Sequence, residues 1–339
     1  MAILLCLAAW LAAAPVFGRE IVDMSGRNVT IPDTVGKVVG MSPPATYLLY
    51  AIAPEVVAGL NFPLWDDEKK YTLGNYRKLP VVGGMIGQGR TINREVLLAV
   101  APDFVLHWAG RKNSAAGRKF EEQLAQLAIP RVDVHLDGLE DYPAALQFLG
   151  DTLQRPERGA ELRRYAEAAL TEVQEVVAEI PDDRRVAVYY AEGLDGLSTE
   201  RAVSTHAELI PVTGGKNVHA GEALDNYGME KISMEQLLLY DPEVILVKEK
   251  SFFSTVFTDP RWRDLRAVKA GRVHLIPHSP FNWFDRPPSF MRLLGAKWLL
   301  GILHPERYRI DMVAETRAFY RLFLGVELSE HEAREVLVR

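Results

Sequence analysis

Short runs of apolar residues alternate along the chain with segments whose apolar positions recur every three or four residues. Short continuous runs are typical of strands that a parallel sheet buries on both faces, whereas the longer spacing indicates helices. Strands that alternate with helices predict an α/β fold with right-handed crossovers. In the first half, the pattern predicts strands at 38–42, 56–60, 103–108 and 131–134 and helices at 45–51, 93–100 and 119–127.

One segment, residues 156–180, interrupts this alternation. After Gly159 it contains neither glycine nor proline, and Ala, Glu, Leu and Arg, which are good helix formers, dominate it. Leu162, Ala169 and Val173 fall at helical spacing along it. The pattern therefore predicts a single long helix over this segment, ended by the proline that follows.

The alternation begins again after this helix. The second half predicts strands at 186–190, 244–247 and 273–276, helices at 232–239 and 288–303, and a mostly helical tail from residue 310. Two similar halves joined by one helix predict two Rossmann-like lobes with parallel-rich sheets and a ligand cleft between them. We assign residues 19–153 to the N-terminal lobe, 154–182 to the connecting helix and 183–339 to the C-terminal lobe.

One local pattern occurs in both halves. Glu95 and Glu235 each stand near the start of a predicted helix, and six residues separate each of them from a proline that precedes a buried strand. Helix–proline–strand units are common in α/β proteins, so the pattern alone is also compatible with coincidence. The matched position of the glutamate favours a true internal repeat.

The N-terminus differs from the rest of the chain. Residues 3–17 are almost all apolar or small, a run too short for a membrane span and typical of a secretory signal peptide. We expect residues 1–18 to be removed and the mature chain to be periplasmic or otherwise extracytoplasmic, although no Lys or Arg precedes the run. The single cysteine, Cys6, lies in a poor match to a lipid-attachment site, so we expect no lipid anchor, no disulfide and no thiolate metal site in the mature chain.

Composition narrows the function further. With 339 residues, 48% of them apolar, the chain is long enough for two domains. A net charge of -6 argues against nucleic-acid binding. The eight histidines are scattered, so we expect no site for a bare divalent metal ion. The usual hydrolase, dinucleotide and zinc-protease motifs are absent from the sequence, which disfavours an enzyme; a chelatase-like enzyme is the remote alternative and requires a cytosolic location.

Several ordered segments resemble the periplasmic binding proteins of ABC importers for ferric siderophores, cobalamin and haem. The resemblance covers nearly the whole mature chain and rests on residues 38–60, 79–84, 93–105, 122–129, 214–218, 232–247 and 262–273. It implies a monomer that binds a ligand in a shallow site between two lobes, with a rigid helical connector, small closure and no chemical reaction. It also implies a membrane partner, an ABC permease dimer with its cytoplasmic ATPase. In the family, one surface glutamate of each lobe docks onto permease arginines, and Glu95 and Glu235 match those positions.

Side chains at the carboxyl ends of the predicted strands, and in the loops that follow, are expected to line the cleft. The glycine-rich loop 87–90 lets backbone approach a ligand closely. In the family, an aromatic residue often packs on the ligand at the position of Trp108. The aromatic and cationic cluster 281–286 lies between a strand and a helix and has little reason to be core. The candidate ligand-binding residues are Pro44, Gln88, Arg90, Trp108, Arg111, Tyr190, Arg201, Trp283, Phe284 and Arg286.

These residues point to two classes of ligand. Aromatic walls suit a large metal chelate, and planar arginine cations suit carboxylate, catecholate or hydroxamate oxygens, so we predict an iron(III)-siderophore-type chelate. An oxoanion needs backbone N–H groups and one cation, which the loop ending at Arg90 offers, so molybdate or tungstate is an alternative. Cobalamin, haem and nickel complexes remain open as well. Arg286 could instead pair locally with Asp285. We expect no resident cofactor.

Overall fold

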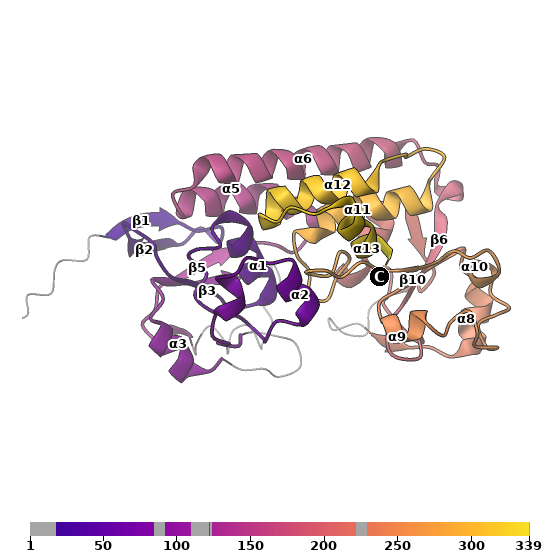
Figure 1. Cartoon of the computed structure of the whole chain (residues 1–339), viewed down its shortest axis with the longest axis horizontal. Coiled ribbons are helices and arrows are strands. Elements are labelled where there is room, and N and C mark those ends of the chain that lie inside the picture. The colour runs from indigo at the N-terminus through magenta and orange to yellow at the C-terminus, as the bar shows by residue number, and fades with distance from the viewer. Residues whose placement is uncertain (1–17, 85–91, 110–121, 123, 222–228, 339) are drawn as a thin grey trace, which may run out of the picture.

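The computed structural model describes residues 18–84, 92–109, 122, 124–221 and 229–338. Two lobes lie side by side below a layer of long helices (Figure 1). Parallel sheets flanked by helices confirm the predicted α/β class. The elements of the first half are β1 (Gly18–Val22), β2 (Asn28–Pro32), β3 (Val38–Gly40), α1 (Pro43–Ile52), α2 (Asp66–Lys70), α3 (Arg94–Val100), β4 (Phe104–Trp108), β5 (Arg131–Val134) and α5 (Tyr142–Thr152).

The N-terminal lobe is built on the parallel sheet β3-β4-β5, and the antiparallel hairpin β1-β2 lies beside it. Phe104, Val105 and Leu106 of β4 are fully buried, as the continuous apolar run predicts. Residues 56–60 form isolated bridges rather than a full strand, because only Val57 and Leu60 pair with neighbouring segments. The helix predicted at 119–127 lies largely outside the described residues.

The second half repeats this architecture with a four-stranded parallel sheet of order β11-β10-β6-β8. A separate two-stranded antiparallel sheet, β7-β9, is linked to the end of β6 by the bridge between Glu192 and Ser198. The elements of this half are β6 (Val186–Ala191), β7 (Ser198–Thr199), α7 (Leu209–Val212), β8 (Gly215–Asn217), β9 (Glu230–Lys231), α8 (Met234–Tyr240), β10 (Val244–Val247), α9 (Lys250–Phe253), α10 (Arg266–Lys269), β11 (Val273–Leu275), α11 (Met291–Leu303), α12 (Met312–Phe319) and α13 (Glu330–Val338).

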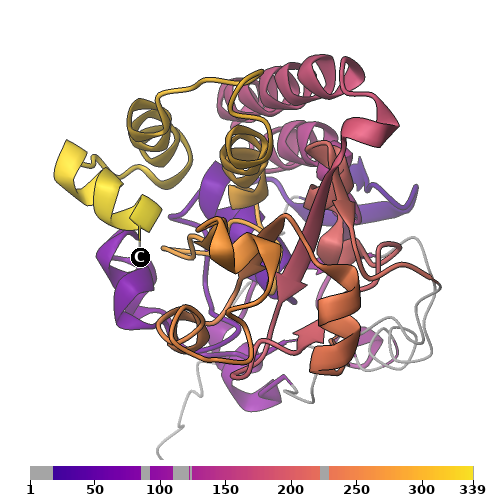
Figure 2. The same cartoon turned by 90° about the vertical axis from the view of Figure 1, so that its right-hand side faces the viewer.

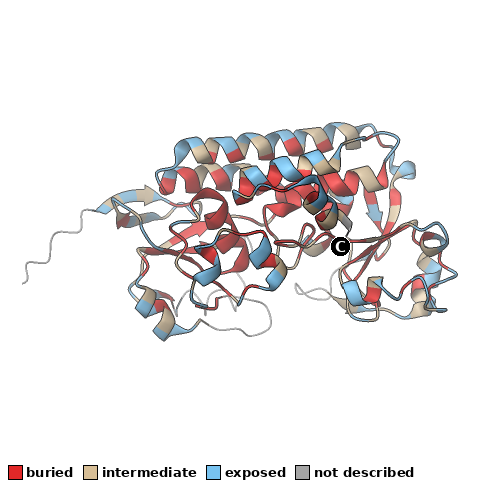
Figure 3. Ribbon diagram, in the orientation of Figure 1, coloured by how far each residue is buried: buried red, intermediate tan, exposed pale blue. Residues whose placement is uncertain are grey.

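The predicted connecting helix is α6 (Pro156–Ala178), which runs along both lobes in Figure 1. Its buried residues form one stripe and its opposite side is exposed (Figure 3), the pattern of a helix packed on one face. It packs closely on α5 because Gly150 and Gly159 meet there: a Cβ built on Gly159 would lie 3.0 Å from the Gly150 Cα. Larger side chains at this contact would push the two helices apart.

The C-terminal segment of the chain contacts residues of the first half. Tyr50 donates a hydrogen bond of 3.0 Å to the carbonyl oxygen of Leu324, and Lys70 of α2 forms an ion pair of 3.1 Å with Glu335 of α13. Figure 2 likewise shows the yellow C-terminal helix beside helices of the N-terminal lobe. The assignment of residues 183–339 to a C-terminal lobe stays a prediction, and these contacts tie its end to the other lobe.

Candidate functional site

A pocket of about 530 Å³ lies where the two halves of the chain meet. One wall comes from α1, the loop after residue 60 and α2, and the other comes from the loop between β11 and α11. A concave site between lobes that combines aromatic and polar side chains has the general form of a small-ligand site. Its lining residues are Tyr47, Phe62, Trp65, Asp66, Asp67, Glu68, His278, Pro280, Phe281, Asn282, Arg286 and Pro287.

The N-terminal wall presents an exposed aromatic side chain above a row of carboxylates. Trp65 is 76% exposed, far more than a tryptophan needs to be for packing alone. Directly after it, α2 begins with Asp66, Asp67 and Glu68, where acidic side chains favour a helix start. A carboxylate oxygen of Glu68 accepts a hydrogen bond of 2.6 Å from the Trp65 amide, which fixes the start of the helix.

Glu68 differs from its two acidic neighbours because it is buried. Burial raises the pKa of Glu68 to about 7, while the hydrogen bond from the Trp65 amide and the charge of Lys69 oppose the shift. Its carboxyl group, which is among those that line the pocket, therefore titrates near neutral pH. His278 faces this wall from the other half, with its Nε2 atom 3.9 Å from a carboxylate oxygen of Asp67.

The aromatic cluster 281–286 is largely buried, although Phe281, Asn282 and Arg286 line the inter-lobe pocket. Phe281 crosses to the N-terminal lobe and stacks on Tyr47 at 3.8 Å between ring centroids. Trp283 is fully buried and its indole N–H donates to the carbonyl oxygen of Ser279 at 3.2 Å. Gly295 of α11 makes this close packing possible, because a Cβ there would lie 1.9 Å from the Trp283 carbonyl oxygen. The loop thus fastens the two lobes together.

Arg286 is the predicted ligand residue that does line the pocket, but carboxylates already hold its guanidinium group. Its Nε atom lies 2.9 Å from Glu192, and its terminal nitrogen forms an ion pair with Glu200; both glutamates are fully buried. The local pairing with Asp285 is weaker, at 3.7 Å. Burial opposes the charge of Arg286, yet the two glutamates beside it raise its pKa. The guanidinium group of Arg286 therefore already has two carboxylate partners, and its contact with a ligand stays a prediction.

Burial disfavours the charged form of the carboxylates that pair with Arg286. Burial raises the pKa of Glu192 to about 7, against the opposing effect of Arg286 and of Lys248, whose ammonium nitrogen lies 3.6 Å away. The carboxylate of Glu200 has additional hydrogen-bond donors: it accepts hydrogen bonds from the Met229 amide at 2.9 Å and from the Ser204 hydroxyl at 2.8 Å. The C-terminal wall of the pocket is therefore a preassembled ion cluster.

Among the residues that the structure describes, the other predicted ligand residues do not line this pocket. Pro44 is buried in the first turn of α1, and Tyr190 and Phe284 are buried against each other at 4.7 Å between ring centroids. Arg201 is paired with Glu230 at 2.6 Å. Burial leaves almost none of the Tyr190 and Phe284 rings accessible, and their contact with a ligand stays a prediction. Gln88, Arg90 and Arg111 lie outside the described residues.

Trp108 lies at the carboxyl end of β4, as predicted, and is partly buried against the core. Its indole N–H donates a hydrogen bond of 3.3 Å to Asp137. It does not belong to the residues that line the inter-lobe pocket. Its contact with a ligand stays a prediction.

The two matched helices have the same local structure. Asn93 caps α3 by accepting a hydrogen bond from the Val96 amide, and Ser233 caps α8 by accepting one from Gln236. Both helices have seven residues and both end at a residue in the left-handed region, Ala101 and Asp241, with φ of 49° and 37°. The sequence repeat is therefore a structural repeat. In Figure 1, α3 and α8 lie on the same edge of the molecule, one on each lobe, opposite α6.

Glu95 and Glu235 are exposed in the first turns of these helices. Within the described ranges, neither carboxylate takes part in an ion pair. Backbone and Ser233 hydrogen bonds lower the pKa of Glu235, so its carboxylate stays charged. One anionic group therefore stands on each lobe at the shared edge.

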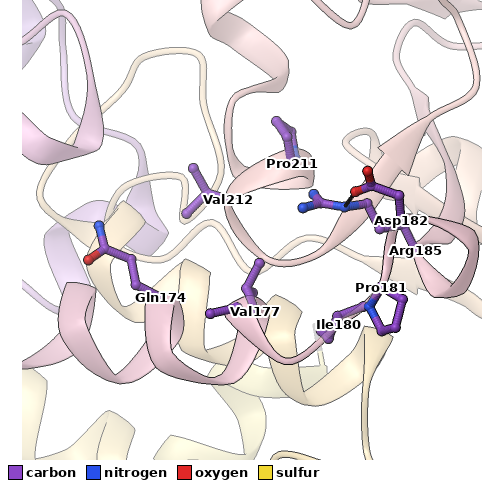
Figure 4. Close-up of a pocket in the computed structure, with 9 residues that line it drawn as sticks. Gln174, Val177, Ile180, Pro181, Asp182, Arg185, Pro211 and Val212 are labelled. Atoms are coloured by element: carbon purple, nitrogen blue, oxygen red, sulfur yellow. Dashed lines mark hydrogen bonds and ion pairs between the residues drawn. The ribbon is translucent and has the colours of Figure 1, made fainter.

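A second pocket, of about 590 Å³, lies at the C-terminal end of α6 (Figure 4). Asp182 and Arg185 are its charged groups, and they are paired with each other at 2.9 Å. The rest of its wall is mostly apolar, with Val177 and Pro211 among its residues. Because it lacks converging polar groups and lies on one side of the lobe junction, we place the functional site in the inter-lobe pocket.

The described part of the chain contains no group of three or more His, Cys, Asp or Glu side chains placed to hold a metal ion. Among those same residues, no helix combines the length and apolar character needed to cross a bilayer.

Sequence reasoning missed most of the pocket wall. Phe62, Trp65 and Asp67 follow the segment 56–60, which the apolar pattern identifies as strand-like. The rule that cleft residues follow strand ends points to this loop as well. An aromatic residue followed by three acidic ones, directly after an apolar run, was the available signal.

Residues 49–280 match a protein family described as periplasmic binding protein. An ABC transporter solute-binding protein from Sulfurospirillum deleyianum is 37% identical in sequence and has a TM-score of 0.88, over 94% of this chain and 98% of that one. The molybdate-binding protein MolA of Haemophilus influenzae is 24% identical over 348 residues, which cover 94% of each chain. The vitamin B12-binding protein of Pectobacterium atrosepticum is 26% identical over 222 residues, or 62% of this chain and 71% of that protein.

Proposed function

We propose that this chain, which belongs to the periplasmic binding protein family, captures a metal chelate of the iron(III)-siderophore type in its inter-lobe pocket. Its relatives are substrate-binding proteins of ABC transporters rather than enzymes, and the chain is a substrate-binding protein of the same class. The finer assignment of the ligand rests on one observation: an exposed tryptophan and further aromatic rings stand around the pocket.

The aromatic wall favours a chelate because a metal complex with an organic shell offers a broad apolar face. Trp65 and Phe62 provide flat contact area on the N-terminal side of the pocket. Aromatic rings give large contact at low cost in side-chain entropy. A small oxoanion has no such face and needs hydrogen-bond donors instead.

Charge narrows the class of chelate. The described wall carries the carboxylates of Asp66 and Asp67, whereas the guanidinium of Arg286 is already shared between two buried glutamates. Like charges brought together in a partly desolvated pocket repel each other. An iron(III) ion held by three hydroxamate groups is neutral, whereas one held by three catecholate groups is strongly anionic. We therefore place a ferric trihydroxamate ahead of a ferric tricatecholate.

Molybdate or tungstate is the second candidate, and the similarity to MolA along 94% of the chain favours it. The vitamin B12-binding relative keeps a corrin chelate in consideration in the same way. An oxoanion would use the loop of Gln88 and Arg90 rather than the tryptophan wall, so the two candidates predict different contacts on the same chain.

Delivery completes the proposal. Glu95 and Glu235 stand one on each lobe, at one edge of the molecule, where they suit cationic groups on the two halves of a permease dimer. We propose that these carboxylates dock the loaded protein onto the permease. We further propose that the chain works outside the cytoplasm after removal of residues 1–18 as a signal peptide.

Isothermal titration calorimetry of the chain from residue 19 tests the ligand class. The panel is a ferric trihydroxamate, a ferric tricatecholate, cyanocobalamin, haemin, a nickel–histidine complex and sodium molybdate. The proposal predicts saturable binding of the trihydroxamate and at least about tenfold weaker binding of the tricatecholate, a difference of about 1.4 kcal/mol. Binding of molybdate alone would overturn the chelate assignment and leave the family assignment intact.

A further inference from the structure

The repeated helices α3 and α8 share more than a glutamate. Position by position, both place a glutamate second, a fully buried leucine fourth and an exposed leucine fifth. The exposed leucines are Leu98, 55% exposed, and Leu238, 44% exposed. On a helix surface, residues three apart are neighbours, so each exposed leucine lies beside the glutamate of its own helix.

Folding accounts for the buried leucine but not for the exposed one. Leu97 and Leu237 anchor their helices in the cores of the two lobes. Leu98 and Leu238 point away from those cores, and a polar residue at this position would serve the helix equally well. Single exposed leucines are ordinary on protein surfaces. Here, however, an exposed leucine follows an exposed glutamate by three residues in the matching helix of each lobe. Such a repeated arrangement is not expected by chance.

We propose that Glu95 with Leu98, and Glu235 with Leu238, are two copies of one docking unit for the permease. In each unit the carboxylate pairs with a cation of the permease, and the leucine enters an apolar depression one helical turn away. This inference rests on the proposed delivery of ligand to an ABC permease. In this arrangement the leucines add apolar contacts to the charge pairs. Buried apolar contacts of this kind contribute much of the binding energy of stable interfaces.

The duplication itself identifies the kind of partner. A surface that repeats on two lobes is complementary to a partner that presents one surface twice, as a two-fold symmetric dimer does. The placement of α3 and α8 on one edge, with the long helices on the opposite side, lets both units meet such a dimer at once (Figure 1). Two linked contacts reinforce each other, because the second forms without a further loss of translational freedom.

The two units are unequal in one respect. Leu239, which follows Leu238, is 81% exposed, whereas Ala99 stands at the matching position of α3. The C-terminal unit therefore offers more apolar surface than the N-terminal unit. We expect the α8 unit to contribute more to the lifetime of the complex, since apolar burial acts mainly on dissociation.

Fluorescent labelling tests whether the leucines enter the interface. The chain from residue 19 has no cysteine, so Leu98→Cys and Leu238→Cys each create a single labelling site for a polarity-sensitive dye. Glu175→Cys on the exposed side of α6 is the matched control. On addition of the permease–ATPase complex of this importer in nanodiscs, the emission at 98 and 238 should shift to the blue, and the emission at 175 should not. An unshifted emission at both leucine sites, with the complex formed, would overturn the inference.

Serine variants then separate the leucines from the charges. Leu98→Ser with Leu238→Ser should raise the protein concentration that half-saturates the ATPase stimulation at least about tenfold. Leu194→Ser changes a leucine elsewhere that is 81% exposed, and it should leave this concentration unchanged. Leu238→Ser with Leu239→Ser should act more strongly than Leu98→Ser. If only Glu95→Lys with Glu235→Lys weakens the stimulation, the leucine unit is wrong and the charge docking stands. If the unmodified chain neither binds nor stimulates the complex, the proposed delivery itself fails.

Discussion

The two lobes of this protein match on their outer edge and differ on the walls that face each other. On the edge, α3 and α8 carry the same glutamate and the same leucines in the same register. Inside, the N-terminal wall presents an exposed tryptophan and carboxylates, while the C-terminal wall presents an arginine locked between buried glutamates. A symmetric partner would require the first arrangement and an asymmetric ligand the second, so the difference supports our proposal that the edge serves delivery and the inner walls serve ligand binding.

Reversing both edge charges is the strongest way to break this comparison. Glu95→Lys with Glu235→Lys should abolish uptake of the bound chelate, a loss of about a hundredfold or more, because two carboxylate–cation pairs become repulsive contacts. Ligand affinity measured by calorimetry should not change, since neither residue lines the pocket. Survival of uptake in the double variant would show that docking uses another surface.

Removing the arginine of the C-terminal wall tests whether that wall is a structural cluster. Arg286→Ala leaves Glu192 and Glu200 buried without their guanidinium partner and should lower the free energy of unfolding by about 3–5 kcal/mol. Arg266→Ala, which removes an exposed arginine at 3.8 Å from Asp241, should cost less than about 1 kcal/mol. Urea unfolding measures both, and equal small losses would mean that Arg286 is free to serve a ligand.

Glu68 of the N-terminal wall should make the free energy of unfolding depend on pH. The pKa of Glu68 is raised from 4.5 to about 7 in the folded chain. The protonated carboxyl group therefore contributes fully to the free energy of unfolding below about pH 4.5, and this contribution is lost as pH rises to 7. Glu68→Gln should therefore gain stability over the unmodified chain between these values, by up to about 3 kcal/mol. Thermal unfolding from pH 4.5 to 8 measures the difference. Glu175→Gln, on the exposed face of α6, should show a flat difference, and a flat profile for Glu68→Gln would contradict the burial effect.

The two tryptophans of the N-terminal lobe give the finest comparison. Trp65→Ala should weaken chelate binding by about 1–3 kcal/mol, or roughly 5- to 150-fold, because the ring contributes contact area at the mouth of the pocket. Its stability should hardly change, since the side chain is 76% exposed. Trp108→Ala should affect stability more than affinity, because the ring packs on the core and bonds to Asp137. Calorimetric titration with thermal unfolding of each variant distinguishes these outcomes.

Local patterns explain which features could be predicted. The strand at residues 131–134, the strand at 244–247 and the helix α6 have apolar spacing that packing does not override. The helices α3 and α8 could be predicted for the same reason, since their caps, glutamates and proline stops lie within a few residues of one another. Each of these features can be predicted from one short segment of the sequence alone.

The pocket depended on contacts between distant segments. Phe281 and Trp283 lie in a loop whose sequence suggests exposure, but Phe281 is buried against Tyr47 of α1 and Trp283 is buried beside Gly295 of α11. Arg286 has the composition of an anion site, yet two glutamates from the strand region near β6 and β7 take up its charge. No local pattern reports such a partner, so its effect appears only in the folded chain.

The central claim is that an apolar-faced chelate binds against the tryptophan of the N-terminal wall. Fluorescence titration of the chain from residue 19 with a ferric trihydroxamate tests it directly, with correction for absorption by the ligand and with Trp65→Phe as the comparison. We predict saturable quenching in the unmodified chain that is largely lost in Trp65→Phe, because the other tryptophans from residue 19 onward are buried or partly buried. Equal quenching in both proteins, or none in either, would contradict this assignment of the ligand site.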